Sequence, residues 1–328
     1  MILILGSHHY EQGTDPVIDW LIYYKVPFLK ITLNDLFYAE NGLSVNIGKR
    51  QIFYRGINLN EEVNVVWYRH FMEAYTPLLE EKDPISTRMN KETHNEISCF
   101  MEMFQEYLKD KKWFSGMDAV YLNKLTVLNA AEEAGLKIPL SAVLTSRREV
   151  LRLLEEQKLE KLIMKPFSDR SKSYYTIGER SYVTFVQEFS KKDAESLQDR
   201  FFPALFQEKI ETDFEIRVFY LDGNCTSTAI LIDGGYDTDD RKKITDSNRI
   251  SVVQYALPKT VEDQLIYLMK TLNLMMGSVD LIRTLRGDFV FLEINPIGQY
   301  SYESEKNNFY TEKKIAECLM HYNKFTKS

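Results

Sequence analysis

Two carboxylates and an amide near the C-terminus are spaced so that they could bind a metal ion. Ser278–Thr284 and Phe289–Asn295 are short runs rich in Val, Ile, Leu and Phe, and the four residues between them, 285–288, predict a β-hairpin. Successive side chains in a strand alternate between faces, so Glu293 and Asn295 point the same way. The second strand therefore carries two oxygen ligands on one face.

A turn centred on Arg286 and Gly287 brings an aspartate opposite the glutamate. Opposed positions in a hairpin have equal index sums, so this centre pairs Asp280 with Glu293. Hard oxygen ligands in a small cluster, with room for water and phosphate, suit Mg²⁺. An exposed and solvated acidic face is the alternative interpretation. The metal site is favoured, because Glu293 and Asn295 inside an apolar strand are costly without a cation.

The composition excludes several classes of protein. The chain has 328 residues, enough for two or three domains, with 44% hydrophobic and 27% charged residues. Its net charge of −7 disfavours a nucleic-acid partner, which needs a basic surface. No apolar run approaches the length of a membrane span, and Cys99, Cys225 and Cys318 are too scattered for a disulfide framework. We therefore expect a cytoplasmic protein without a membrane partner.

The N-terminal third predicts a small parallel sheet. Buried strands at Met1–Leu5 and Phe28–Ile31 flank a helical pattern at Pro16–Lys25, which gives a β–α–β opening. A further buried strand is expected at Val63–Tyr68. An amphipathic helix at Glu92–Lys111 then closes the first domain near residue 112.

Charged side chains also occur inside predicted strands of the remaining two thirds. Lys165 ends an apolar run and needs an anionic partner, either a protein carboxylate or a bound phosphate. The basic loop Phe167–Tyr175 that follows would suit a flap over phosphates, although it lacks the glycines that let backbone amides approach. Glu215 and Arg217 lie two residues apart in a strand and share one face.

The order and spacing of these residues resemble the ATP-grasp superfamily. The residues that carry the resemblance are Lys124, Lys165, Gln207-Glu208-Lys209-Ile210, Glu215-x-Arg217, Asp280 and Glu293-x-Asn295. The similarity spans nearly the whole chain. The string NKLTVLNAAEEAGLKIP resembles the helix that opens the ATP-grasp portion, and LEINPIGQY resembles the metal-binding signature.

More narrowly, the chain is similar to the ATP-grasp maturases that cyclise ribosomally made peptides. Their products are ω-ester and ω-amide peptides called graspetides, of which microviridins are one class. The strings MILIL, VIDWLIYY, VVWYRH and NPIGQYSYES are most similar to the grasp-with-spasm branch. The resemblance implies an α/β ATP-grasp fold with an N-terminal parallel-sheet domain and two α+β subdomains that clasp ATP. The expected domains are residues 1–112, a central lid at 113–206, and a C-terminal domain at 207–328 that holds Mg²⁺.

The resemblance also implies a role for each candidate residue. Lys124 and Lys165 would reach the phosphates of ATP as point charges. Gln207, Glu208, Lys209 and Ile210 would form the hinge that binds adenine, and Glu215 would accept hydrogen bonds from the ribose. Arg217 would lie near the transferred phosphoryl group. Arg241 and Arg249 would stabilise the acyl phosphate or the acceptor carboxylate. Asp280, Glu293 and Asn295 would hold one or two Mg²⁺ ions.

The implied activity is ATP-dependent cyclisation of a precursor peptide with a leader and a Thr/Ser- and Asp/Glu-rich core. The enzyme would activate Asp or Glu carboxylates and join them to Ser or Thr hydroxyls or to a Lys amine, releasing ADP and phosphate. The resemblance leaves a homodimer open. One alternative is an ATP-grasp ligase that adds an amino acid to a small molecule or a protein tail. A non-catalytic, nucleotide-dependent peptide binder is the other.

Overall fold

In the computed structural model, the apolar run at the N-terminus forms an inner strand of a four-stranded parallel sheet. The strands are β1 (Ile2–Leu5), β2 (Phe28–Ile31), β6 (Val65–Tyr68) and β7 (Lys112–Phe114), in the order β2-β1-β6-β7. Every residue of β1 and β6 is buried, as expected for parallel strands covered on both faces. The predicted β–α–β opening is confirmed.

Helices and a small antiparallel sheet accompany these strands. The helices are α1 (Asp15–Tyr23), α2 (Leu33–Tyr38), α3 (Leu59–Glu62), α4 (Pro84–Tyr107), α10 (Ser301–Asn307) and α11 (Thr311–Phe325), and the small sheet contains β3 (Leu43–Asn46), β4 (Gln51–Tyr54) and β5 (Ile57–Asn58). Helix α4 begins well before the predicted Glu92. Its start is a capping box, in which the Asp83 carboxylate accepts from the backbone N–H groups of Ile85 and Ser86.

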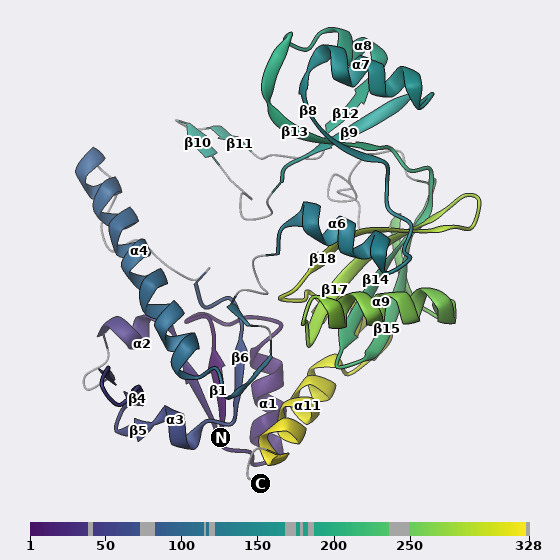
Figure 1. Ribbon diagram of the computed structural model, residues 1–328. Helices are drawn as coiled ribbons and strands as arrows, with labels where there is room; N and C mark the ends of the chain where they lie inside the picture. The colour runs from purple at the N-terminus through teal and green to yellow at the C-terminus, as the bar shows by residue number, and fades with distance from the viewer. Residues whose placement is uncertain are drawn as a thin grey trace. The chain divides into compact units, whose positions relative to one another are not determined.

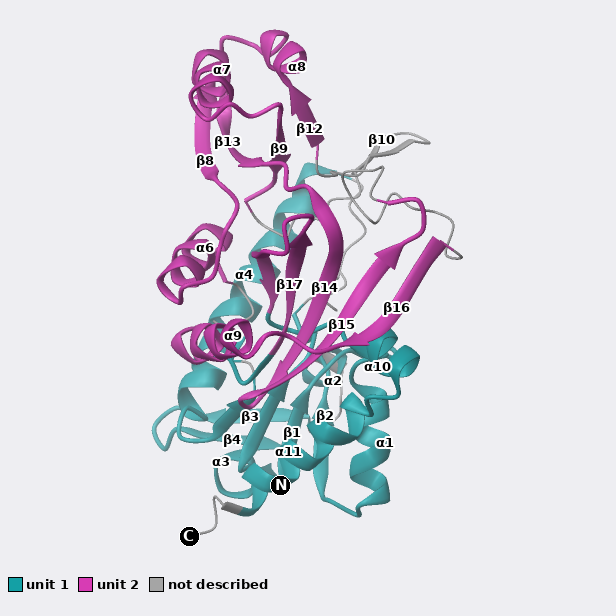
Figure 2. Ribbon diagram, turned by 90° about the vertical axis from the view of Figure 1, so that its right-hand side faces the viewer, with its two compact units in different colours: residues 1–120, 274–276, 296–328 teal, residues 121–273, 277–295 magenta. Residues whose placement is uncertain are grey.

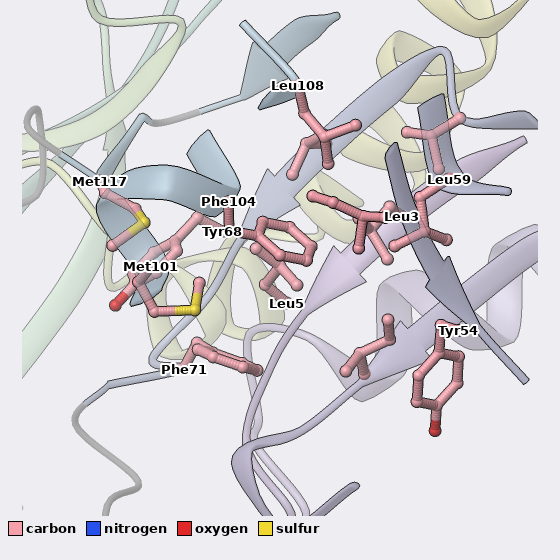
Figure 3. Close-up of a cluster of buried hydrophobic side chains, with 14 of the residues drawn as sticks. Leu3, Leu5, Tyr54, Leu59, Tyr68, Phe71, Met101, Phe104, Leu108 and Met117 are labelled. Carbon is pink, nitrogen blue, oxygen red and sulfur yellow. The ribbon is translucent and has the colours of Figure 1, made fainter. Parts of the chain in front are cut away.

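The core of this part of the chain joins the parallel sheet to α4. Leu3, Leu5 and Tyr68 belong to the same buried cluster as Met101 and Phe104 of α4 (Figure 3). Complete burial of a large apolar side chain contributes about 1.5–3 kcal/mol. The parallel strands therefore have a rigid packed base, and the residues that follow their C-terminal ends are attached to it.

A second sheet follows in the chain and is entirely antiparallel. It contains β8 (Ser141–Ser146), β9 (Lys161–Lys165), β12 (Gln187–Ser190) and β13 (Arg200–Glu208), in the order β12-β9-β13-β8. Helices α7 (Arg147–Glu156) and α8 (Lys191–Glu195) accompany it, and β10 (Tyr175–Ile177) pairs with β11 (Arg180–Tyr182). Val150, Leu154, Leu162, Phe189 and Phe206 form its buried core.

The third sheet carries most of the candidate site. Its strands are β14 (Thr212–Leu221), β15 (Asn224–Ile232), β16 (Ile250–Tyr255), β17 (Met276–Thr284) and β18 (Phe289–Asn295), in the order β16-β15-β14-β17-β18. Helix α9 (Lys259–Thr271) packs on β15, and α6 (Lys124–Glu133) packs on β18 and α9 (Figure 1). Alternate residues of the central strands, Ile216, Val218 and Val279, are almost completely buried.

The structure describes residues 1–38, 42–72, 83–114, 116–117, 122–167, 175–177, 180–182, 187–235 and 249–325. The chain divides into two units, which Figure 2 colours separately: Met1–Val120 with Leu274–Met276 and Pro296–Ser328, and Tyr121–Asn273 with Gly277–Asn295. The finer division into three domains, with boundaries at 112 and 206, stays a prediction. Among the described residues, no helix is both long and apolar enough to cross a membrane.

Candidate active site

The hairpin of β17 and β18 brings the three candidate metal ligands into register. Asp280 lies directly opposite Glu293, and Ser278 lies opposite Asn295. The predicted pairing of the two carboxylates is therefore confirmed. Because Glu293 and Asn295 are two residues apart in one strand, their side chains lie on the same face as that of Asp280.

A β-bulge produces this register. Near the turn, Arg283 pairs with Phe289 and Leu281 pairs with Phe291, so Leu292 is the extra residue before Glu293. The turn is therefore centred on Arg286, whereas the sequence predicted a centre between Arg286 and Gly287. Without the bulge, this turn would place Asp280 opposite Leu292 and move Glu293 to the other face.

Each carboxylate in the pair accepts hydrogen bonds from a cationic side chain. The Lys124 ammonium donates to Oε2 of Glu293 at 3.0 Å. Arg217 donates twice to Asp280, from Nε to Oδ1 at 2.8 Å and from Nη2 to Oδ2 at 3.0 Å. Two negative and two positive side chains thus form one compact cluster, called the carboxylate–cation cluster below. Charge-assisted contacts of this kind are stronger than those between neutral groups.

Different elements deliver the two cations. Lys124 is the first residue of α6, and the preceding Asn123 caps the helix by accepting a hydrogen bond from the Leu125 N–H. Arg217 lies in β14, the strand next to β17 in the sheet order. Its neighbours Ile216 and Val218 are buried on the other face. Alternation along β14 therefore directs Arg217 to the face that carries Asp280.

Glu215 shares the Arg217 face of β14. It pairs with Ile230 of β15, and Arg217 pairs with Thr228, so the two charged residues are one strand repeat apart. Glu215 is half-buried. This placement agrees with the predicted common face, and the role of Glu215 toward a ribose stays a prediction.

The predicted hinge spans the end of β13 and the connection to β14. Gln207 is buried, and its side-chain amide donates to Ser141 Oγ at 2.8 Å. Glu208 N–H donates to the Leu140 carbonyl at 2.9 Å, and the Lys209 ammonium contacts the Glu188 carboxylate. Ile210, which follows the strand, is half-buried. The side chains of Gln207 and Lys209 thus bind other parts of the second sheet.

The other predicted phosphate and acceptor residues lie on separate strands. Lys165 is the last residue of β9, half-buried and opposite Leu205 of β13. Arg249 precedes β16, an edge strand separated from β17 by β15 and β14, and its guanidinium donates to the Asp233 carbonyl at 2.8 Å from Nη2. Arg241 lies outside the described residues, as does most of the predicted flap.

Comparison with solved structures identifies the architecture. No family model matches the chain, and no curated protein matches it in sequence. Its fold is similar to that of the macrocyclase MdnC from Microcystis aeruginosa MRC, bound with the precursor peptide MdnA. The TM-score is 0.79 at 24% identity, over 98% of this chain and 99% of MdnC.

A second similar structure is the ATP-grasp ligase PsnB in complex with a minimal precursor, Mg and ADP. The TM-score is 0.76 at 18% identity, over 98% of each chain. The chain has the ATP-grasp fold. An ATP-grasp ligase associated with ribosomally made peptides from Chryseobacterium gregarium, in complex with ADP and a leader and core peptide, is also similar. Its TM-score is 0.72 at 17% identity, over 98% of this chain and 96% of that one.

In this ATP-grasp chain, the carboxylate–cation cluster has the donor chemistry for Mg²⁺. Asp280, Glu293 and Asn295 offer carboxylate and amide oxygens, and the two carboxylates are 30% and 35% exposed. Mg²⁺ commonly uses one or two carboxylates and keeps water and phosphate as its remaining ligands. Within the described residues, no group of three His, Cys, Asp or Glu side chains could hold a metal alone. The donor set of the cluster therefore fits Mg²⁺.

The sequence pattern does not predict that both cations bind the carboxylates directly. Lys124 lies 169 positions before Glu293, and Arg217 lies 63 positions before Asp280. Spacing along the chain carries no signal for such long-range pairs. The alternation of Glu215 and Arg217 did give the correct face, but only the sheet order places β14 beside β17.

Proposed function

We propose that the chain is an ATP-grasp ligase that cyclises a ribosomally made precursor peptide. A side-chain carboxylate of Asp or Glu in the peptide attacks the γ-phosphate of ATP, which gives an acyl phosphate and ADP. A Ser or Thr hydroxyl, or a Lys amine, of the same peptide then displaces phosphate and closes an ester or amide ring. The observation that carries the proposal is the carboxylate–cation cluster inside a fold similar to MdnC and PsnB along nearly its whole length.

The cluster suits phosphoryl transfer because that reaction needs positioned charge rather than a protein nucleophile. Asp280, Glu293 and Asn295 would hold Mg²⁺, which neutralises phosphate charge when bound. Lys124 and Arg217 would provide positive charge beside the same phosphates. Both already donate hydrogen bonds to the carboxylates, which hold the two positive charges beside the candidate metal ligands.

The remaining site residues complete the proposal for the nucleotide and the acceptor. Lys165 binds phosphate, the segment Gln207–Ile210 binds adenine mainly through its backbone, and Glu215 binds the ribose. Arg241 and Arg249 stabilise the acyl phosphate or the acceptor carboxylate. In support of this division, the side chains of Gln207 and Lys209 have protein partners, so adenine contacts would use main-chain groups or Glu208.

The proposed partner is a leader peptide joined to a core rich in Thr or Ser and in Asp or Glu. We further propose that the protein is cytoplasmic and that it can form a homodimer. The absence of a disulfide framework among the three cysteines supports a reducing compartment.

The direct test is to incubate the purified chain with ATP, Mg²⁺ and candidate precursor peptides, and to measure peptide mass and ADP. We expect loss of one water per ring and release of one ADP per ring. An unchanged peptide mass with every candidate, together with no Mg²⁺-dependent binding of ATP, would contradict the proposal.

The same experiment separates the two alternative functions. A ligase that adds an amino acid to a small molecule or a protein tail increases the mass of its acceptor, whereas cyclisation decreases the mass of the peptide. A non-catalytic nucleotide-dependent binder retains peptide affinity but releases no ADP. The number of water molecules lost then gives the number of rings.

A further inference from the structure

A completely buried arginine binds the segment that follows the candidate metal-binding strand. The Arg69 side chain is 1% exposed. Its Nη1 donates to the carbonyl oxygens of Ile297 and Gly298, Nε donates to Thr14 Oγ1 at 3.2 Å, and Nη2 donates to Glu11 Oε2 at 3.0 Å. All four partners lie at least 55 positions from Arg69 in the sequence. Such a residue connects segments rather than stabilising one helix or strand.

The partners of Arg69 are themselves held in place. The Glu11 carboxylate accepts from Gly13 N–H at 2.9 Å and from the Thr14 hydroxyl. Burial alone would raise the pKa of Glu11, but the charge of Arg69 and these hydrogen bonds lower it below its ordinary value. A Cβ at Gly13 would overlap the Arg69 guanidinium, so glycine is needed there. The buried charge therefore has an ionised partner.

The segment bound by Arg69 is also fastened by an aromatic side chain. Tyr300 is 2% exposed, and its hydroxyl donates to the Gly13 carbonyl. Burial raises the pKa of this hydroxyl, so it remains a donor at neutral pH. The guanidinium of Arg69 also lies over the Tyr300 ring, at 5.9 Å from its centroid. Residues 297–300 are thus held in two ways: the carbonyls of Ile297 and Gly298 accept hydrogen bonds from Arg69, and the Tyr300 hydroxyl donates to Gly13.

Covalent continuity connects this anchor to the candidate metal ligands. Strand β18 ends at Asn295, and one peptide bond leads to Pro296 and the anchored segment. Pro296 restricts the backbone at this point and cannot donate a ladder hydrogen bond. On the other side, Arg69 directly follows β6, and its N–H donates to the Leu5 carbonyl at 2.7 Å. The guanidinium is therefore attached to the buried parallel sheet.

We propose that Arg69 is a positioning residue for the metal-binding end of β18. It binds the carbonyls two and three residues beyond Asn295, and so holds the backbone where the chain leaves β18, the strand whose Glu293 and Asn295 would bind Mg²⁺. This inference rests on the proposed function. It adds a residue from the N-terminal parallel sheet that does not itself touch metal or nucleotide.

The geometry of arginine is essential to this role. The planar guanidinium presents five donors in a fixed fork, so one side chain binds two adjacent carbonyls, a hydroxyl and a carboxylate together. Lysine keeps the charge but has three donors at a single point. The Arg69→Lys variant therefore tests orientation while preserving the charge balance with Glu11.

The experiment measures binding of a fluorescent ADP analogue with Mg²⁺ and, separately, with EDTA. We expect Arg69→Lys to weaken Mg²⁺-dependent nucleotide binding roughly 10-fold or more, the usual effect of losing support behind a metal ligand. Binding in EDTA should change less than about twofold, because the direct nucleotide contacts remain. Hydrogen exchange at the backbone amides of residues 297–300 should become faster in the same variant.

Asn64 provides the matched control. Asn64 directly precedes β6, whereas Arg69 directly follows that strand. Asn64 is also buried, and its side-chain amide donates to Asn323 Oδ1 at 3.1 Å. Asn64→Ala should lower the unfolding temperature without changing the Mg²⁺ dependence of nucleotide binding. Tyr300→Phe keeps the ring and removes only the bond to Gly13, so it should fold and show a smaller loss in the same direction as Arg69→Lys.

Three results would overturn the inference. Unchanged Mg²⁺-dependent binding in both Arg69→Lys and Tyr300→Phe would exclude a positioning role. An equal loss in Asn64→Ala would assign the effect to stability, as would equal losses with Mg²⁺ and with EDTA. By contrast, failure of the wild-type chain to bind the analogue with Mg²⁺ would contradict the proposed function itself. The wild-type measurement therefore separates the two failures.

Discussion

Arg217 binds Asp280 through two parallel hydrogen bonds, with lengths of 2.8 Å and 3.0 Å. The two side chains are 17% and 30% exposed, and they come from adjacent strands of the third sheet. A bidentate contact fixes the orientation of both groups as well as their distance. Because Asp280 lies opposite Glu293, this contact also sets the position of one side of the candidate metal site.

Replacing Arg217 with lysine should therefore reduce the ATP-dependent reaction strongly. Lysine keeps one positive charge but cannot make both hydrogen bonds to Asp280. We expect a fall in turnover of about 100-fold, comparable to the loss of one preorganised electrostatic donor. The measurement is the steady-state rate of ADP release with saturating precursor peptide.

Arg283→Lys is the control for that prediction. Arg283 also forms an ion pair across this sheet, with Asp213, but its side chain and that of its partner are 34% and 37% exposed. Loss of an exposed pair costs about 0–1 kcal/mol, so activity should change little. If Arg217→Lys retained the activity of Arg283→Lys, Arg217 would have no special role in the reaction.

Glu293→Gln should abolish ATP-dependent peptide modification and leave the fold intact. The change removes a charged metal ligand but keeps the shape of the side chain and one oxygen. Because Glu293 is 35% exposed, its ion pair with Lys124 contributes modestly to stability. The measurements are the rate of peptide modification over a range of Mg²⁺ concentrations and the unfolding temperature.

Asp288→Asn tests whether any acidic residue of the same hairpin would give this effect. Asp288 lies in the turn and pairs with Lys137 at 2.7 Å, with both side chains about half exposed. We expect its activity to stay within about twofold of wild type, since surface pairs contribute little. A fully active Glu293→Gln enzyme would remove Glu293 from the site.

The parts of the fold that follow a local pattern could be predicted from the sequence. The bounds of β18 are those predicted, and the apolar runs that became β1 and β6 are nearly so. The extent of α9 is less evident from the sequence, because the apolar residues of this helix continue to Met276 whereas α9 ends at Thr271. Asn273 adopts a left-handed conformation, with φ of 53°, which ends the helix. The apolar residues that follow it belong to the strand.

Features that depend on tertiary context could not be predicted. Strand β13 begins at Arg200, although Pro203 argues against a strand there; an irregular register between Arg200 and Ala204 accommodates the proline. The bulge at Leu292 could not be predicted either, because the need for an extra residue follows from the observed position of the turn. The partners of Lys124, Arg217 and Arg69 all depend on contacts between segments distant in the chain.

Lys165→Met should chiefly weaken nucleotide binding. Lys165 ends β9 and is half-buried, and methionine keeps most of the side-chain length while removing the charge that would contact phosphate. We expect an increase of about 10-fold in the dissociation constant of ATP, the equivalent of one charge-assisted hydrogen bond. Lys161→Met, at the other end of the same strand, is the control, because Lys161 contacts Glu188 and is 48% exposed. Equal ATP affinities for the two variants would count against a phosphate role for Lys165.

Acid should remove part of the stability that Glu11 provides. Its folded-state pKa lies below the ordinary value of 4.5: burial alone would raise the pKa, but Arg69 and the hydrogen bonds from Thr14 and Gly13 outweigh burial. A lowered folded-state pKa means that the unfolded chain binds the proton more tightly than the folded chain does. The stabilisation is therefore complete above the unfolded pKa and is lost as the pH falls through the folded pKa.

Glu11→Gln makes this pH dependence measurable. The variant leaves the buried Arg69 charge without a carboxylate, so it should lose about 2–4 kcal/mol of stability near neutral pH. The difference from wild type should narrow as the pH falls below the ordinary value of 4.5, where the unfolded chain takes up the proton before the folded chain does. Urea unfolding at a series of pH values measures this difference in unfolding free energy. Glu305→Gln, at an exposed site on α10, is the control. A stability difference that is constant from about pH 7 to pH 3 would show that Glu11 acts through its shape and not its charge.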